Sequence, residues 1–167
     1  MRAVLMGNPN VGKSVIFNRL TGVKVVVSNY PGTTIEYLEG IMRVNGVKLK
    51  VVDAPGTYSL IPSDKAEEVA LNLLLRKQTD LIINVVDATN LERNLYLTLQ
   101  LREINIPMIL DLNMIDAARH RGIEIDVSLM EKLLKLPIVC TVAVSGEGIK
   151  ELYQLIKEFV VGKEKES

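Results

Sequence analysis

A glycine-rich segment between a short apolar run and a helical pattern constrains this chain more than any other feature. The segment Gly7–Ser14 (GNPNVGKS) fits the pattern G-x-x-x-x-G-K-[ST], after the apolar run Arg2–Met6 and at the start of the helical pattern Lys13–Thr21. The glycines let the backbone turn its N–H groups toward phosphate oxygens, and the helix N-terminus adds a partial positive charge. We expect Lys13 to neutralise the β- and γ-phosphates and the Ser14 hydroxyl to bind Mg²⁺. The alternative is a glycine-rich turn without a ligand, but the flanking strand and helix are the context that a phosphate loop requires.

Short apolar runs alternate with helical patterns along the chain, and this alternation predicts an α/β fold. Six strands are expected, at Arg2–Met6, Leu38–Val44, Val47–Val52, Leu81–Val86, Pro107–Leu112 and Ile138–Val144. Five helices are expected, at Lys13–Thr21, Asp64–Arg76, Leu91–Glu103, Val127–Leu134 and Ile149–Val160. The alternation predicts a three-layer P-loop fold with a six-stranded, mostly parallel sheet. Asn45-Gly46 predicts a tight hairpin, so we expect one antiparallel edge strand in this sheet.

The composition is that of one globular domain without a strongly charged surface. The chain has 167 residues, with 20 basic and 20 acidic side chains, so it lacks the positive charge of a dedicated nucleic-acid binder and we expect no nucleic-acid partner. The one cysteine, Cys140, cannot form an internal disulfide, and no apolar run reaches the ~18 residues of a membrane span. We assign residues 1–161 to the domain and Gly162–Ser167 to a charged tail that begins a linker.

An acidic motif is expected at the same edge of the sheet as the phosphate loop. Asp53-Ala54-Pro55-Gly56 follows the third apolar run, and ligands of such sheets bind at the carboxyl ends of the strands. Asp53 can hold Mg²⁺ through a water, and the Gly56 N–H can reach a γ-phosphate. Alone, D-x-P-G predicts only a turn. About 40 residues after Lys13, it is the expected second half of a phosphate and metal site.

Two further motifs predict recognition of a purine base. Asn113-Met114-Ile115-Asp116 ends the fifth strand, and a carboxylate at Asp116 can accept two hydrogen bonds from guanine N1–H and N2–H₂, which adenine does not offer. Asn113 is expected to brace this loop and to bond the other edge of the base. At the end of the sixth strand, Val142-Ala143-Val144 offers backbone N–H groups, of which that of Ala143 is best placed for guanine O6. N-x-x-D alone is a common helix cap, but the four motifs in order predict a guanine nucleotide site.

The ordered motifs resemble those of translation-factor-class P-loop GTPases, and longer stretches resemble the ferrous-iron transport protein B (FeoB) family. These stretches are 85–101, 29–36, 58–60 and 122–126. The base motif also has Met114 where most GTPases have a lysine. The resemblance implies a GTP-binding, GTP-hydrolysing regulatory domain at the cytoplasmic face of the cell membrane, which acts as a nucleotide switch. Its implied partners, a helical domain and a membrane-spanning ferrous-iron channel, lie outside this chain. A homo-oligomer would form through that full-length protein.

The resemblance also assigns individual residues. It aligns Thr34, rather than the neighbouring Thr33, with the threonine of a mobile loop (switch I) that binds Mg²⁺ and the γ-phosphate. It aligns Asn10 with an asparagine that holds K⁺ in similar GTPases, together with backbone carbonyls that correspond to Ser28–Tyr30. The expected catalytic residues are Lys13, Thr34, Gly56 and Asn10, and the expected metal ligands are Ser14, Thr34 and Asp53 for Mg²⁺ and Asn10 for K⁺. The expected contacts to GTP or GDP are Gly7, Asn8, Pro9, Asn10, Val11, Gly12, Lys13, Ser14, Val15, Thr33, Thr34, Asp53, Gly56, Asn113, Met114, Asp116, Val142, Ala143 and Val144.

The intrinsic rate is expected to be slow and stimulated by potassium. Thr57 follows Gly56 where many GTPases have a glutamine that positions water, and its side chain is too short to reach as far. Arg19 is expected at the surface rather than at the reacting phosphate, and the charged face of Asp64–Arg76 is expected to be solvated.

Two other functions fit part of this pattern. A free-standing GTPase of the ribosome-assembly or tRNA-modification type shares the four motifs but normally adds an RNA-binding module and positive charge. A P-loop kinase or ATPase acting on a small molecule shares the phosphate loop, but Asn113 and Asp116 argue against it.

Overall fold

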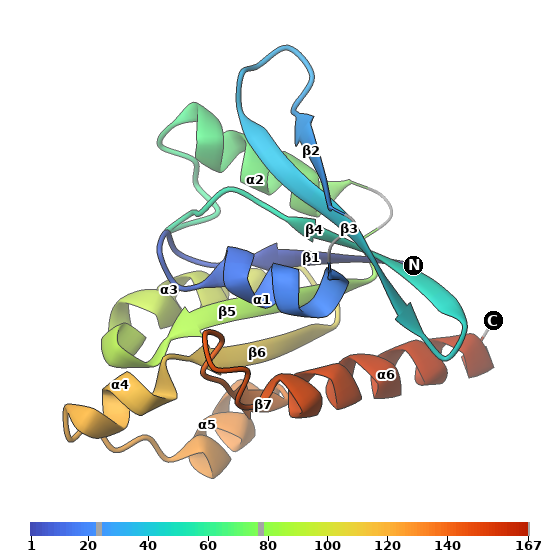
Figure 1. Cartoon of the computed structure of the whole chain (residues 1–167). Helices are drawn as coiled ribbons and strands as arrows, with labels where there is room; N and C mark the ends of the chain where they lie inside the picture. The colour runs from blue at the N-terminus through green and yellow to red at the C-terminus, as the bar shows by residue number, and fades with distance from the viewer. Residues whose placement is uncertain (23–24, 77–78, 167) are drawn as a thin grey trace.

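The computed structural model describes residues 1–22, 25–76 and 79–166, and over these residues the chain forms an α/β fold around one seven-stranded sheet (Figure 1). The strands are β1 (Arg2–Met6), β2 (Val25–Asn29), β3 (Glu36–Val44), β4 (Val47–Asp53), β5 (Leu81–Asp87), β6 (Met108–Asn113) and β7 (Ile138–Cys140). The helices are α1 (Lys13–Thr21), α2 (Lys65–Leu75), α3 (Leu91–Arg102), α4 (Ile115–His120), α5 (Val127–Leu134) and α6 (Ile149–Glu166), with a 3₁₀ turn at Ala88–Asn90. The order across the sheet is β2-β3-β4-β1-β5-β6-β7. The predicted fold class is confirmed.

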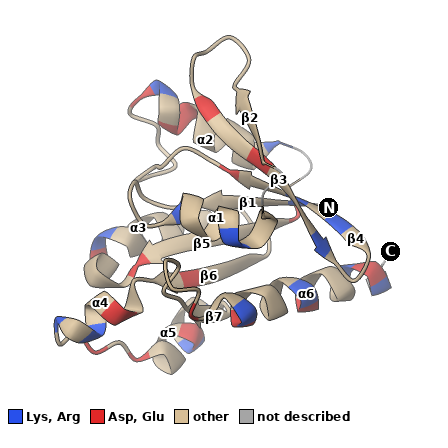
Figure 2. Ribbon diagram, in the orientation of Figure 1, with Lys and Arg blue, Asp and Glu red and all other residues tan. Residues whose placement is uncertain are grey.

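Helices cover both faces of the sheet because the central strands are apolar on both sides. On β1, Ala3 and Leu5 pack into one core cluster, and Val4 and Met6 pack into another, as the alternation of a strand requires. The first cluster receives apolar side chains of α1 and α6, and the second receives those of α2 and α3. A third cluster lies under α4 and α5 at the β7 end. Figure 2 shows basic and acidic residues interspersed along the helices and along the strands β3 and β4.

The sheet has one strand more than the sequence predicts. β2 pairs with β3 along Val25–Asn29, and two of its valines, Val26 and Val27, are exposed by 61% and 58%. An exposed edge strand of this kind carries neither the alternating pattern nor the continuous burial by which strands are recognised. The Asn45-Gly46 hairpin forms as predicted, with φ of 49° and 83°. β3 is antiparallel to both neighbours, so the one reversed strand lies one place in from the edge.

One further helix and two element boundaries also differ from the sequence prediction. α4 has only six residues, too few to show helical periodicity, and was not expected. α6 continues through the segment 162–166 that was expected to be a charged tail; Ser167 lies outside the described residues. β7 ends at Cys140, earlier than predicted, because the chain then forms a turn in which Val142 pairs with Glu147. Among the described residues, no helix is both long and apolar enough to cross a membrane.

Candidate nucleotide-binding site

The phosphate loop connects β1 to α1, and its geometry requires glycine at two positions. Gly12 has a φ of 93°, and a Cβ there would collide with the side chain of Asn113. A Cβ on Gly7 would collide with the backbone carbonyl of Val85 on β5. Asn10 is also left-handed, with a φ of 66°. Alternation between left- and right-handed residues turns successive N–H groups to one side and forms a concave site for an anion.

A cavity of about 500 Å³ joins the phosphate loop to the base motif. Its volume is in the range of sites for small molecules. It is lined by Asn10, Gly12, Lys13, Ser14, Val15, Asn113, Met114, Asp116, Ala117, Val142, Ala143 and Val144. Every lining residue except Ala117 is among the predicted nucleotide contacts. Segments more than 100 residues apart in the sequence thus meet around one cavity, at the carboxyl ends of β1, β6 and β7.

A second hollow of about 280 Å³ begins at Lys13 and Ser14 and extends toward Asp53 and Gly56. The Ser14 hydroxyl donates a hydrogen bond of 2.6 Å to Asp53 Oδ2. The other carboxylate oxygen, Oδ1, is buried and has no hydrogen-bond partner among the described residues. A hydroxyl and a carboxylate are oxygen ligands of the kind that Mg²⁺ prefers, so these two residues fit the predicted metal site.

Lys13 and Asp53 stabilise each other's charge in this buried place. Burial lowers the pKa of Lys13, and the negative charge of Asp53 opposes that shift. Burial raises the pKa of Asp53, and the charge of Lys13 and the hydrogen bond from Ser14 oppose it. The site therefore places an amine and a carboxyl group, each of which favours the charged form of the other, where phosphate and metal are expected.

Gly56 lies directly against the phosphate loop. A Cβ on Gly56 would come within 2.8 Å of Pro9 Cα, and the next residue, Thr57, donates its N–H to the Gly7 carbonyl over 3.0 Å. The Thr57 side chain is only 1% exposed and its hydroxyl contacts the Ser59 carbonyl and Glu67, away from the phosphate loop. Thr57 is therefore directed away from any reacting phosphate as well as too short.

Glu67 is an exception to the expectation that the charged face of α2 is solvated, whereas the side chains of Lys65 and Glu68 are exposed as expected. Its side chain is buried, and its carboxylate accepts hydrogen bonds from the backbone N–H groups of Tyr58 and Ser63 and from the Ser63 hydroxyl. These bonds lower its pKa to about 2, with the Tyr58 N–H as the largest cause. Asp64 followed three positions later by Glu67 matches the capping-box pattern at a helix N-terminus, so the sequence contained a signal for a structural role of Glu67.

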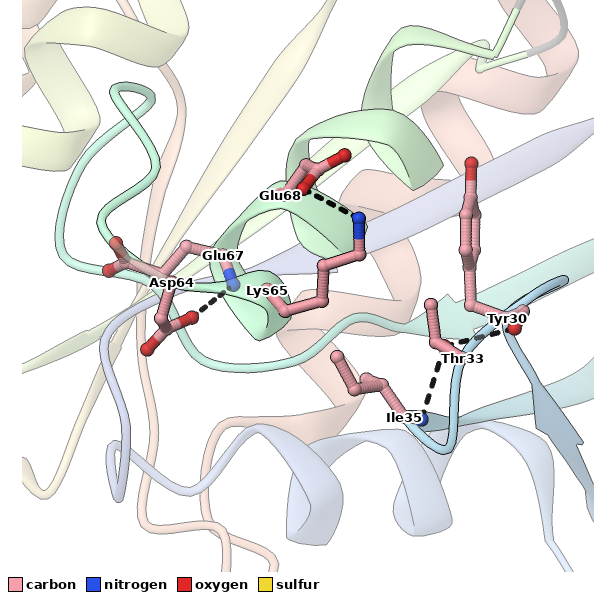
Figure 3. Close-up of polar contacts among 7 residues, drawn as sticks. All are labelled: Tyr30, Thr33, Ile35, Asp64, Lys65, Glu67 and Glu68. Atoms are coloured by element: carbon pink, nitrogen blue, oxygen red, sulfur yellow. Dashed lines mark hydrogen bonds and ion pairs between the residues drawn. The ribbon is translucent and has the colours of Figure 1, made fainter.

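Thr34 and Thr33 lie outside both hollows. The Thr33 hydroxyl donates to the Tyr30 carbonyl and accepts from the Ile35 N–H, which closes the turn between β2 and β3 (Figure 3). Thr34 is exposed. Leu38 on β3 pairs with Asp53, and Thr34 comes four residues earlier in the chain, before β3 begins at Glu36. Among the described residues, Thr34 lines neither hollow and makes no hydrogen bond to Ser14 or Asp53.

The carbonyls expected to assist Asn10 also lie elsewhere. Ser28 and Asn29 are paired with Tyr37 and Glu36 in the β2–β3 ladder. Figure 1 shows this end of β2 well away from the start of α1. Asn10 itself is exposed and lines the cavity.

The base motif is organised by Asn113. Its Nδ2 donates to the Val11 carbonyl over 2.9 Å, and its Oδ1 accepts from the Ala143 N–H over 3.0 Å. Asn113 thus braces the loop as predicted, but it also occupies the N–H of Ala143 that was expected to face guanine O6. Met114 adopts a left-handed φ of 61°, and Asp116 follows in the first turn of α4, exposed at the cavity.

Two residues of this region were missed by the sequence argument. Arg19, expected to be an uninvolved surface residue, donates to the carbonyls of Ala143 and Val144 and so holds the loop that lines the cavity. Asp111 is fully buried under the base motif and bonds Thr141. Neither role leaves a local sequence signal, because each partner is at least 30 residues away in the chain.

A phosphate loop and a base cavity at the carboxyl edge of a parallel sheet covered on both faces characterise a P-loop G domain, and that is the class of this fold. A family model narrows the class further. The chain belongs to the ferrous iron transport protein B family, whose model matches residues 1–156.

Relatives and solved structures agree with this membership. The chain is 43% identical over 167 residues to an Fe(2+) transport protein A/Fe(2+) transporter FeoB fusion protein of Porphyromonas gingivalis, covering 99% of this chain and 20% of that protein. The cytosolic domain of L. pneumophila FeoB superposes with a TM-score of 0.91 at 40% identity, covering 95% of this chain and 68% of that one. A mutant of S. thermophilus NFeoB bound to GDP superposes with a TM-score of 0.86 at 43% identity, covering 92% and 60%. The chain therefore spans about a fifth of the length of the curated relative.

Proposed function

We propose that this chain is the GTP-binding and GTP-hydrolysing regulatory domain of a membrane ferrous-iron transporter, acting as a nucleotide switch at the cytoplasmic face. The observation that carries the proposal is the single cavity that joins Lys13 and Ser14 to Asp116. The similar S. thermophilus protein is described as bound to GDP. The partners would be guanine nucleotide and the helical and transmembrane iron-channel domains, which lie outside this chain.

Base recognition would rest on Asp116 and the loops around it. Its exposed carboxylate at the cavity can accept from both guanine donors, and an adenine would leave that carboxylate unpaired. Asn113 keeps the phosphate loop and the Ala143 loop in register through its two side-chain bonds. Met114 lines the cavity but cannot donate a hydrogen bond, so nucleotide affinity is expected to be modest, on the order of micromolar.

Phosphate binding and hydrolysis would rest on the loop and its two buried charges. Lys13 offsets negative charge on the β- and γ-phosphates, and the loop N–H groups orient them. Ser14 and Asp53 would hold Mg²⁺, which when bound neutralises charge on the same phosphate oxygens. The Gly56 N–H would orient the γ-phosphate. Because the Thr57 side chain is buried against Glu67, it is not placed to position the attacking water, and the intrinsic rate is expected to be slow.

The switch would be the segment from β2 to β3. Thr34 lies exposed and apart from the metal ligands, so γ-phosphate and Mg²⁺ would have to draw this segment inward for Thr34 to bind them. The same movement would release Ser28 and Asn29 from their pairing with β3 and bring their carbonyls toward Asn10, where K⁺ is expected. A γ-phosphate would thus stabilise a second conformation of the segment from β2 to β3, and GDP, which has no γ-phosphate, would not stabilise it.

The test of this function exchanges the base that the cavity prefers. Asp116→Asn should weaken GTP and GDP binding by roughly 2–4 kcal/mol, because a charge-assisted pair of bonds is lost. It should bind xanthine nucleotides more tightly than the parent does, since xanthine presents an acceptor where guanine presents a donor. Glu124→Gln, an exposed carboxylate outside the cavity, is the matched control and should leave titrations of all nucleotides unchanged. Unchanged GTP affinity in Asp116→Asn, or preference of the parent for ATP, would refute the proposed base site.

A further inference from the structure

A buried carboxyl group lies beneath the base motif and is not used by the proposed mechanism. Asp111 on β6 comes two residues before Asn113 and is 0% exposed. Its Oδ1 accepts a hydrogen bond of 2.5 Å from the Thr141 hydroxyl, and its Oδ2 is buried with no hydrogen-bond partner among the described residues. Burial raises the pKa of Asp111 to about 7, and the bond from Thr141 opposes the shift. Both protonation states are therefore accessible near neutral pH.

The Thr141 hydroxyl connects Asp111 to the base motif. Its oxygen lies 2.5 Å from Asp111 Oδ1 and 3.1 Å from Asn113 Oδ1. A hydroxyl has one hydrogen, so Thr141 can donate fully to only one of these two oxygens. Asn113 uses the same Oδ1 to accept from Ala143 and its Nδ2 to donate to Val11. The direction of one hydrogen bond thus affects the residue that joins the phosphate loop to the Ala143 loop.

We propose that Asp111 is a positioning residue of the guanine site, whose proton decides whether Thr141 donates to Asp111 or to Asn113 and thereby sets nucleotide affinity. The proposal rests on the proposed guanine site. A protonated Asp111 donates its O–H to Thr141, and Thr141 then donates to Asn113 Oδ1. An ionised Asp111 takes the Thr141 hydrogen, so two oxygen lone pairs face each other over the 3.1 Å between Thr141 and Asn113. Affinity for guanine nucleotide should therefore fall as the pH rises through neutrality.

The surroundings leave Asp111 as the group that titrates in this network. β5 places Val85 beside it, and the acidic residue of that strand, Asp87, is at the strand end and bonded to Thr89. β7 contributes Cys140, whose pKa is raised by burial; the charge of Arg119 opposes that shift and the charge of Asp111 adds to it. α6 packs apolar side chains on this face of the sheet and keeps Lys150 and Glu151 exposed.

The experiment measures GDP affinity against pH with N-methylanthraniloyl-GDP in the presence of Mg²⁺. Between pH 6 and pH 8 the parent should lose roughly three- to tenfold more affinity than Asp111→Asn, the range that one neutral hydrogen bond is worth. The asparagine amide can donate to Thr141 at every pH, so that variant should keep the high affinity. Ionisation of the GDP phosphates is common to both proteins and cancels in the comparison.

Thr141→Val provides the second variant. Without the Thr141 hydroxyl, the protonation of Asp111 cannot change the hydrogen bonding of Asn113. The variant should therefore bind GDP weakly and lose the extra pH dependence. This variant keeps the test possible if Asp111→Asn fails to fold. Parallel pH profiles of the parent and a folded variant would overturn the proposal.

If the parent does not bind GDP at any pH, the proposed function fails. The hydrogen-bond relay from Asp111 through Thr141 to Asn113 is then still tested by NMR of the protein without nucleotide. The Asn113 side-chain amide should then shift with a midpoint near pH 7 in the parent and stay constant in Asp111→Asn. A constant resonance in the parent would overturn the relay.

Discussion

Replacing Glu67 with glutamine tests whether one buried carboxylate holds the segment that follows Gly56. Glu67 Oε2 accepts from the Ser63 N–H over 2.8 Å and from the Ser63 hydroxyl over 2.7 Å, and Oε1 accepts from the Tyr58 N–H over 3.0 Å. Asp64 in turn accepts from the Glu67 N–H over 2.8 Å and caps α2 (Figure 3). The carboxylate thus organises the connection between the metal-binding edge and α2.

The magnitude follows from the bonds that glutamine cannot make. An amide in place of the carboxylate keeps one oxygen, while its NH₂ faces a backbone N–H that also needs an acceptor. Hydrogen bonds to a charged group contribute about 1.5–3 kcal/mol each, and part of the loss is recovered by local rearrangement. We expect Glu67→Gln to lower the free energy of unfolding by about 2–4 kcal/mol at pH 7.

The dependence on pH separates this explanation from a packing defect. The pKa of Glu67 is lowered from 4.5 to about 2 in the folded protein, so its stabilisation is fully present above pH 4.5 and is lost as the pH falls toward 2. Urea denaturation should therefore show a large difference between the parent and Glu67→Gln at pH 7 and a smaller one at pH 3.

The matched control is the next residue in the helix. Glu68 pairs with Lys65 on the exposed side of α2, over 2.8 Å (Figure 3). A solvated pair of this spacing contributes about 0.3–0.5 kcal/mol, so Glu68→Gln should be nearly neutral. Equal stability of the two variants, or a difference from the parent that is the same at pH 7 and pH 3, would refute the reasoning.

Two other predictions concern the metal sites. Ser14→Ala should weaken Mg²⁺-dependent binding of both GDP and GTP. Thr34→Ala should leave GDP binding unchanged and slow hydrolysis, because Thr34 binds only when the γ-phosphate is present. Equal loss of GDP affinity in titrations of the two variants would argue against a mobile switch I. GTP hydrolysis should run several-fold to tens-fold faster in potassium than in sodium at equal ionic strength, and Asn10→Ala should remove that difference; a tenfold effect is about 1.4 kcal/mol of barrier. Identical rates in both salts, with binding confirmed, would contradict a potassium site.

Local sequence determined most of the helices and strands and most of the cavity lining; β2 and α4 were not predicted. The phosphate loop could be predicted because its glycines, lysine and serine act within eight consecutive residues, between a strand and a helix that are recognisable by themselves. The Asn45-Gly46 hairpin is equally local, since two residues with positive φ suffice to form it. Asp53 and Asp116 could be placed at one edge of the sheet because parallel strands bring their carboxyl ends together.

Tertiary structure alone decided which polar groups are buried and which partner each has. Asn113 binds Val11 and Ala143, which are 102 and 30 residues away, and Arg19 binds Ala143 across 124 residues. Asp111 has an ordinary sequence environment, and its pKa is raised because the fold buries it away from water, against the opposing hydrogen bond from Thr141. The exposed edge strand β2 forms because it pairs with β3 through backbone hydrogen bonds, and the sequence of β2 shows no alternation of apolar and polar residues that would predict this pairing. Hydrogen bonding and desolvation depend on neighbours in space, and for these residues the neighbours come from distant parts of the chain.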